Sequence, residues 1–174
     1  MNADATRTIY LDHAAATPLD PEVLAAMQPY LGGQFYNPSA GYAAGQKVGA
    51  AVDRARDSVA AQLGVRSLAI VFTAGGTEAN NLAIHGVMQQ FAGKHCVVSA
   101  VEHDSVLMPA KRYRHNLAPV SPDGRIDVDR LGRLITDDTV LVSVMYANNE
   151  IGTIQPLKRV VELVAAVRSR RAEA

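Results

Sequence analysis

The sequence has little cysteine, no net charge and no long apolar run, and each shortage excludes a class of protein. Its single cysteine, Cys96, excludes an internal disulfide framework, and no second cysteine or suitably spaced histidine completes a metal-binding pattern. Seventeen basic residues balance seventeen acidic ones without a block of like charge, so nothing favours binding to nucleic acid or to an anionic membrane surface. No apolar run approaches the roughly 20 residues of a membrane span, and the N-terminus lacks the basic-then-apolar pattern of a signal peptide. We therefore expect a cytoplasmic protein with a metabolic role, no membrane contact and no resident metal.

What the chain does contain is an alternation of helical and strand-like segments. With 48% hydrophobic residues among 174, it can bury a core as one globular domain or a large piece of one. The hydrophobic spacing, together with Pro21 and Gly64, predicts helices at 21–31 and 41–64. Further helices are predicted at 77–91, 104–112, 127–136 and 157–171, and buried strands at 69–72, 96–99, 117–120 and 140–145. This order predicts an α/β fold with right-handed crossovers and a mainly parallel sheet.

The stretch "VFTAGGTEANNLAIHG", residues 71–86, passes from a predicted strand through two glycines into a predicted helix. Such a turn leaves backbone N–H groups unpaired at the positive end of the helix dipole, which is a site for an anion. Gly76 has no Cβ to hinder a close approach, and Thr77 can add its hydroxyl as a donor to a phosphate oxygen. The alternative is an ordinary strand-to-helix turn with Thr77 as the N-cap. The glycine spacing matches neither a P-loop nor a dinucleotide-binding fingerprint.

Two further polar groups follow predicted strands. His103, in "VEHDSVLMP", lies just before a helix that Asp104 or Ser105 would cap, and its imidazole can stack on a flat cofactor ring or transfer a proton. In "VSVMYANNEIGTIQPL", residues 142–157, the asparagine pair that ends in Asn149 is suited to hydrogen-bond a hydroxyl or carboxylate of a ligand. The alternatives are a solvated histidine and an asparagine-rich turn with local backbone bonds.

Five motifs, in order along the chain, resemble those of the NifS/IscS-type cysteine desulfurases. They are "YLDHAAATP", "NPSAGYAAGQ", "FTAGGTEANNLAIHG", "VEHDSVLMP" and "VSVMYANNEIGTIQPL". Within them, "TEANNLAI" and "NNEIG" favour this branch over the SufS-like desulfurases and selenocysteine lyases. The resemblance implies pyridoxal 5'-phosphate (PLP) as the cofactor and an aspartate-aminotransferase-like fold, PLP fold type I, whose sheet is incomplete here. It also implies that residues 1–174 are the N-terminal part of the large domain, with an N-terminal segment at 1–40 and an α/β portion at 41–174.

The matching positions carry the family's site residues onto this sequence. Gly76 and Thr77 match the residues that hold the cofactor phosphate. His103 matches the catalytic histidine that stacks on the pyridine ring and takes part in proton transfer. Asn149 matches the asparagine that reaches the ring hydroxyl or the substrate side of the cofactor. His13 stands where an asparagine or tyrosine is usual, so the resemblance predicts less about the contacts of the N-terminal segment.

The residues that would complete the family's site are not found in this sequence. Proteins of this type continue for more than as many residues again, and that part supplies the partner of the pyridinium nitrogen, the Schiff-base lysine and the sulfur-accepting cysteine. The four lysines lack the family's Ser-Gly-His-Lys setting and are interpreted as surface residues: Lys47, Lys94, Lys111 and Lys158. Cys96 opens a predicted strand and is interpreted as a buried hydrophobic residue. The sequence thus predicts half of a site, which is active only if another chain completes it.

The resemblance implies PLP-dependent removal of sulfur from L-cysteine, which gives alanine and an enzyme persulfide for Fe–S cluster or thio-cofactor assembly. The implied partners are a second copy in a homodimer or a complementing C-terminal half, and an Fe–S scaffold or other sulfur acceptor. The predicted strand at 69–72 would lack its partner and leave an exposed edge. Two alternatives stay open. One is a catalytically inactive truncated homologue that acts as a binding or regulatory partner, and the other is a free-standing domain whose glycine turn binds another phosphorylated ligand.

Overall fold

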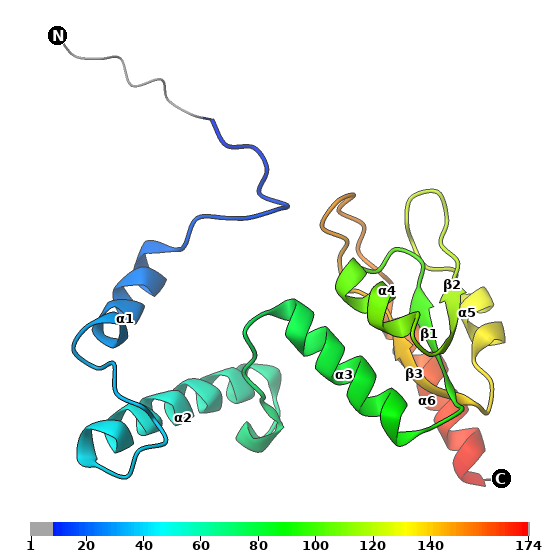
Figure 1. Ribbon diagram of the computed structural model, residues 1–174. Helices are drawn as coiled ribbons and strands as arrows, with labels where there is room; N and C mark the ends of the chain where they lie inside the picture. The colour runs from blue at the N-terminus through cyan, green and yellow to red at the C-terminus, as the bar shows by residue number, and fades with distance from the viewer. Residues whose placement is uncertain (1–8, 174) are drawn as a thin grey trace. The chain divides into compact units, whose positions relative to one another are not determined.

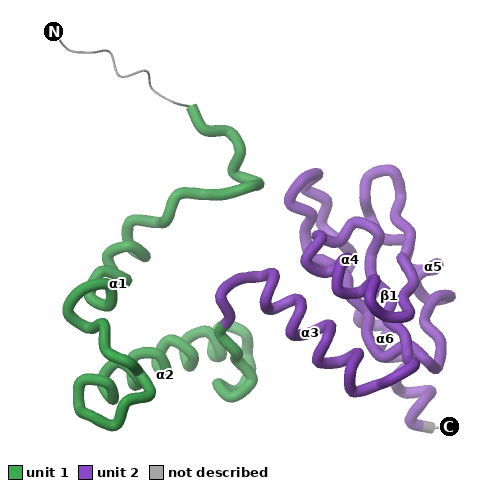
Figure 2. The backbone as a smooth tube through the Cα atoms, in the orientation of Figure 1, with its two compact units in different colours: residues 1–72 green, residues 73–174 purple. Residues whose placement is uncertain are grey.

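The computed structural model describes residues 9–173, which divide into two compact units. Unit 1 comprises the described residues up to Phe72, and unit 2 starts at Thr73 (Figure 2). The domain boundary that the sequence predicts between residues 40 and 41 stays a prediction. Across residues 9–173, no helix has the length and apolar character needed to cross a membrane. The same residues contain no group of three or more His, Cys, Asp or Glu side chains that could hold a metal ion.

Unit 1 consists of two helices and a short 3-10 turn. α1 spans Pro21–Leu31 and α2 spans Ala43–Leu63, so both predicted helices are confirmed. Asp20 caps α1 by accepting a hydrogen bond from the N–H of Glu22 at 2.7 Å. Gly64 ends α2 in the left-handed conformation, with φ 65°, as glycine does at many helix ends. α1 has no buried residue, so local capping rather than burial defines its limits.

The strand predicted at 69–72 is wrong. Ser67–Ala69 form the 3-10 helix η1, and the segment that follows joins no strand of the described sheet. A run of apolar side chains does not make a strand by itself, because the backbone N–H and C=O groups need a partner strand. The side chain of Arg56 contacts this segment in place of a partner strand. Its guanidinium donates to the carbonyl oxygen of Ile70 at 2.9 Å and lies over the ring of Phe72, 4.8 Å from the centroid.

Unit 2 is a three-stranded parallel sheet with helices on both faces (Figure 1). Its elements, in chain order, are α3 (Gly76–Gln90), β1 (His95–Ser99), α4 (Asp104–Ala110), β2 (Arg114–Ala118), α5 (Val128–Leu134), β3 (Thr139–Ser143) and α6 (Leu157–Glu173). The strand order is β2-β1-β3, and both pairings are parallel. The predicted parallel sheet and its flanking helices are therefore confirmed, with β2 beginning and ending earlier than predicted.

β1 is the centre of the core of unit 2, and all five of its residues are buried. One face of the sheet packs against α3 and α4 through Ile84, Met88, Cys96, Val98, Val106 and Ala110. The other face packs against α5 and α6 through Val97, Ala118, Ile126, Leu131 and Val160. Cys96 is fully buried, and this burial raises the pKa of its thiol. The interpretation of Cys96 as a hydrophobic core residue is therefore confirmed.

Candidate functional site

The first turn of α3 presents backbone N–H groups that the helix itself does not use. Gly75 is the N-cap, in an extended conformation with φ 169°, and no side chain caps the helix. Among the described residues, the first N–H of this turn to reach a carbonyl is that of Ala79, which donates to Gly75 O at 3.1 Å. The N–H groups of residues 76–78 therefore remain available at the positive end of a helix of 15 residues. The space beside them is open, since a Cβ built on Gly76 meets no atom within 4 Å.

Two local hydrogen bonds hold this turn in shape. The Thr73 hydroxyl donates to Gly75 O at 3.1 Å, and the N–H of Ala74 donates to the Glu78 carboxylate at 2.6 Å. The second bond turns the Glu78 carboxylate back toward the loop that precedes the helix. The alternative with Thr77 as N-cap is wrong, because Gly75 takes that position. Thr77 lies in the first turn with an exposed side chain, so its hydroxyl is accessible to a ligand.

His103 is held by hydrogen bonds at the start of α4. It is itself the N-cap, and its Nδ1 accepts the N–H of Ser105 at 3.0 Å. The prediction that Asp104 or Ser105 would cap this helix is therefore wrong. The physical reason is that an imidazole nitrogen can accept the free N–H two residues on, as the oxygen of a usual N-cap side chain does. The Oγ atom of Ser105 lies 2.8 Å from the same Nδ1 and 2.8 Å from Nδ2 of Asn80.

This network determines which ring nitrogen of His103 carries the proton. The amide nitrogen of Asn80 can only donate, so Ser105 Oγ accepts from it and donates its own hydrogen to Nδ1 of His103. Nδ1 therefore accepts two hydrogen bonds, and the proton of the neutral ring is on Nε2. The His103 side chain is exposed, and no residue in 9–173 hydrogen-bonds its Nε2. The Nε2–H group is thus the end of the ring that a ligand can use.

Thr77 and His103 line the same pocket, at the N-terminal turns of α3 and α4. The pocket has a volume of about 380 Å³, and Asn81, Met108 and Arg112 also line it. Small-molecule sites in proteins start at about this size. The structure therefore brings together two predicted site residues from separate motifs of the sequence.

The two asparagines of the predicted pair have different roles in the structure. Asn148 ties its loop to the loop after β1, because its Nδ2 donates to Val101 O at 3.1 Å. Its Oδ1 accepts the N–H of Glu150 at 2.9 Å. Asn149 is exposed and donates to Oε1 of Glu150 at 3.1 Å, and it is not part of the pocket lining. Its contact with a ligand stays a prediction.

Glu102, which the sequence analysis missed, is buried next to the end of β3. Its side chain is only 8% exposed, and the Ser143 hydroxyl donates to its Oε1 at 3.2 Å. Burial raises the pKa of this carboxyl, and hydrogen bonds from Ser143 and the backbone of Met145 act in the opposite direction. Glu102 thereby anchors the loop that leads into His103. A signal was available, because Glu102 lies only three residues after the end of the buried strand β1, which places it at the edge of the core.

Comparison with known sequences gives one consistent group of proteins. The chain matches the aminotransferase class-V family over residues 9–169. Cysteine desulfurase IscS of Dictyoglomus turgidum is 43% identical over 159 residues, which are 87% of this chain and 40% of that protein. Cysteine desulfurase IscS of Methanosarcina thermophila is 40% identical over 164 residues, which are 90% of this chain and 41% of that protein. The chain therefore spans less than half the length of these relatives.

Comparison with solved structures gives the same group. A NifS-like protein superposes with a TM-score of 0.85 at 33% identity, covering 90% of this chain and 45% of that chain. A structure of SspA in complex with cysteine superposes with a TM-score of 0.86 at 31% identity, covering 92% of this chain and 48% of that chain. DndA from Streptomyces lividans gives a TM-score of 0.75 at 33% identity, covering 92% and 46%. The predicted fold class is therefore confirmed.

Proposed function

Because the chain belongs to the aminotransferase class-V family, we propose that it supplies the phosphate- and ring-binding half of a PLP site in a cysteine desulfurase. Its relatives at 43% and 40% identity are cysteine desulfurases, which supports PLP as cofactor and L-cysteine as substrate. One observation carries the proposal: Thr77, in the uncapped first turn of α3, and His103, the N-cap of α4, line one pocket.

The residues of this pocket fit the two ends of the cofactor. The N–H groups of residues 76–78 and the Thr77 hydroxyl are donors for a phosphate dianion, and the open space beside Gly76 lets it approach the backbone. The imidazole of His103 offers a flat face for the pyridine ring. Arg112 adds a positive charge to the lining, whereas Asp104 adds a negative one beside α4. The phosphate therefore belongs at the α3 end of the pocket and the ring at the His103 end.

The chain's own residues bind, orient and move a proton in this proposal. When bound, PLP supplies an electron sink for breaking bonds at the substrate's carbon atoms. In the neutral ring of His103 the proton is on Nε2, because Nδ1 accepts hydrogen bonds from Ser105. A second proton taken up on Nδ1 gives the imidazolium, which can donate its Nε2 proton to a ligand and take it back there. Asn149 is proposed to reach the ring hydroxyl or the substrate.

We propose that catalytic turnover requires a completed site. The remaining residues of that site would come from the part of the fold that the relatives contain beyond the matched stretch. The resemblance implies that a lysine there would hold the cofactor, and that a cysteine thiolate there would take the sulfur of L-cysteine as a persulfide, with alanine as the other product. We propose the cytoplasm as the compartment, a homodimer or a complementing C-terminal half as the partner, and an Fe–S scaffold or similar protein as sulfur acceptor. The relatives' names support the reaction class.

Titration of the purified chain with PLP, followed by cofactor absorbance and fluorescence, tests the binding half. We expect PLP to bind about tenfold or more tightly than pyridoxal, which lacks the phosphate. Thr77→Val should weaken PLP binding several-fold, since one hydrogen bond contributes about 1 kcal/mol. Thr136→Val, at an exposed position that does not line this pocket, is the matched control. Equal affinity for PLP and pyridoxal, or equal effects of the two variants, would contradict the proposal.

Sulfide release tests the catalytic half. The chain is mixed with the separately produced C-terminal part of the Dictyoglomus turgidum enzyme, and L-cysteine is added together with dithiothreitol, the thiol that reduces the enzyme persulfide to thiol and sulfide. Sulfide and alanine in equal amounts are expected from the mixture and from neither part alone. PLP binding without sulfide release would instead support the alternative of an inactive binding or regulatory partner.

A further inference from the structure

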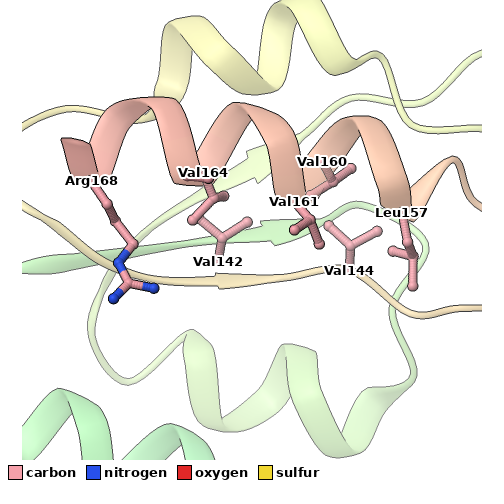
Figure 3. Close-up of a pocket in the computed structure, with 8 residues that line it drawn as sticks. Val142, Val144, Leu157, Val160, Val161, Val164 and Arg168 are labelled. Atoms are coloured by element: carbon pink, nitrogen blue, oxygen red, sulfur yellow. The ribbon is translucent and has the colours of Figure 1, made fainter. Parts of the chain in front are cut away.

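The segment between β3 and α6, residues 144–156, is a compact loop that carries Asn149, and we call it the Asn149 loop (Figure 1). Figure 3 shows Val144, the first residue of this loop, beside Leu157, the first residue of α6. Both side chains line one groove of about 340 Å³ between β3 and α6. The two ends of the loop are therefore held close together by the sheet and by α6.

Backbone hydrogen bonds give the Asn149 loop the shape of a hairpin. Ala147 and Ile154 form an antiparallel bridge. The N–H of Asn148 donates to the carbonyl oxygen of Thr153 at 2.9 Å. Asn149 follows directly, at the closed end of the hairpin, so its position depends on where the hairpin as a whole is held.

Gln155 attaches this hairpin to the turn between β2 and α5. Its side chain is only 3% exposed, and its Oε1 accepts the N–H of Ile126 at 2.8 Å while its Nε2 donates to the carbonyl oxygen of Gly124 at 2.8 Å. A primary amide has a donor and an acceptor side by side, which is what a backbone C=O and N–H two residues apart require. An apolar side chain at this position would leave both buried backbone groups without a partner.

The turn to which Gln155 is bound is itself fixed by the core. Ile126 is only 4% exposed and belongs to the core cluster between the sheet and the helices α5 and α6. The hydroxyl of Thr153 adds a second attachment, because it donates to the carbonyl oxygen of Asp123 in the same turn. One leg of the hairpin is thus anchored to the best-packed part of unit 2.

The other leg of the hairpin is attached close to His103. Nδ2 of Asn148 donates to the carbonyl oxygen of Val101 at 3.1 Å, two residues before the histidine. Within residues 9–173, the side chain of Asn149 itself bonds only to its neighbour Glu150. The placement of Asn149 relative to His103 therefore depends on the attachments of the two legs, of which the bonds of Gln155 are the most deeply buried.

We propose that Gln155 is a positioning residue, which holds the Asn149 loop so that Asn149 reaches the ring hydroxyl of PLP. Gln155 does not line the pocket of Thr77 and His103, so it acts on a ligand only through Asn149. This inference rests on the proposed function, because the contact between Asn149 and the ring belongs to it.

The experiment uses the whole chain, with PLP as the added ligand, and compares Gln155→Met with Asn149→Ala. Methionine has nearly the shape of glutamine but lacks the amide that bonds Gly124 and Ile126. Each variant should weaken PLP binding about fivefold, as the loss of one hydrogen bond does. The double variant should bind no more weakly than either single variant, because both changes remove the same contact. Gln90→Met, at the exposed last position of α3, should leave the affinity unchanged.

NMR spectra separate positioning from a general loss of stability. When PLP is added to the wild-type chain, the side-chain NH₂ resonances of Asn149 and the backbone N–H resonances of residues 76–78 should all shift. In Gln155→Met the shift at Asn149 should be lost, whereas the shifts at residues 76–78 should remain. Hydrogen exchange without ligand should rise in residues 146–154 and stay unchanged in β1.

A milder variant covers the case in which Gln155→Met unfolds unit 2. Thr153→Val removes only the half-buried hydroxyl that donates to Asp123, and it should reduce the shift at Asn149 in the same way. A shift at Asn149 that persists in a folded Gln155→Met, or in Thr153→Val when Gln155→Met does not fold, would overturn the inference. So would effects of Gln155→Met and Asn149→Ala that multiply in the double variant.

Failure of the proposed function gives a different result. If PLP shifts no resonance of residues 76–78 in the wild-type chain, the phosphate site is absent and both proposals are overturned. If PLP shifts residues 76–78 but not Asn149 in the wild-type chain, phosphate binding stands and only the inference about Gln155 is overturned.

Discussion

Unit 1 and unit 2 contain similar amphipathic helices but bury them to very different extents. In unit 2, the helices pack on both faces of a parallel sheet and form two clusters of buried side chains. In unit 1, α1 buries no residue and α2 buries only Gly45, Val48 and Ala60. Both units have helices where the sequence predicts them. Helical spacing and caps therefore specify local structure in each unit, whereas a core requires the sheet that only unit 2 has.

This difference predicts where the stability of the chain lies. Burial of apolar surface contributes about 25 cal/mol per Å², so unit 2 holds most of the hydrophobic stabilisation. Leu24 and Met27 of α1 are 44% and 43% exposed, and such partly covered residues contribute much less. We expect unit 1 to open locally at a low free energy and unit 2 to unfold as one cooperative structure.

The largest expected effect comes from truncating the core of unit 2. Leu131 is fully buried, so Leu131→Ala should lower the free energy of unfolding of unit 2 by about 3 kcal/mol. Leu24→Ala makes the same chemical change at an exposed position of α1 and should alter stability by less than about 0.5 kcal/mol. Urea denaturation followed by circular dichroism measures both. If both variants lowered the free energy of unfolding equally, the two units would not differ in how much buried side chains stabilise them.

The next largest effect is expected in unit 1 alone, where one substitution should lower the free energy of unfolding by about 2 kcal/mol. A Cβ on Gly45 would lie 2.7 Å from the carbonyl oxygen of Asn37, so Gly45→Ala forces the segment at 37–40 away from α2. Hydrogen exchange should rise in residues 37–49 and stay unchanged in β1. Gly41→Ala is the matched control, because a Cβ there meets no atom within 4 Å. A loss of protection in β1 would show that the units unfold together.

The sequence predicts correctly those elements that neighbouring residues determine. The prediction is wrong where a segment needs a partner strand that is distant in the sequence. The start of α1 follows from Asp20 and Pro21, and the end of α2 follows from Gly64, because each acts on adjacent backbone groups. The apolar run at 69–72 has strand-like composition, yet no described strand pairs with it and it does not form one. Hydrophobic pattern thus predicts the type of surface a segment offers, but not whether another segment covers it.

The candidate site shows the same limit. Gly76, Thr77 and His103 could be predicted as site residues because each lies at a turn or strand end that is visible in the sequence, and their contacts with a ligand stay a prediction. The residues that orient His103 could not be predicted, because no spacing rule shows that Asn80 of α3 reaches Ser105 of α4. Contacts of this kind depend on how two helices pack, and only the folded chain specifies that.

A smaller effect is expected in unit 2, where loss of the hydrogen bonds around His103 should lower the free energy of unfolding by about 1 kcal/mol. Ser105→Ala removes the hydroxyl that donates to Nδ1 and accepts from Asn80. The preference for the proton on Nε2 should weaken, which two-bond proton–nitrogen NMR spectra of the imidazole report directly. Ser169→Ala, at an exposed position of α6, should leave these spectra unchanged. If Ser105→Ala also left them unchanged, the assigned tautomer would have another cause.

The smallest expected effect concerns how the free energy of unfolding of unit 2 depends on pH, to which Glu102 contributes. Burial raises its pKa in the folded chain above the ordinary value of 4.5, so the folded state holds this proton more tightly than the unfolded state. The free energy of unfolding should therefore fall as the pH rises from about 4.5 through the folded pKa, and level off above it. Glu102→Gln keeps an oxygen that can accept from Ser143 but cannot ionise, so this part of the slope should disappear. Glu162→Gln, at an exposed position of α6, should retain it. Urea denaturation across this pH range decides the matter, because parallel curves for wild type and Glu102→Gln would mean that Glu102 does not titrate in the folded chain as its burial requires.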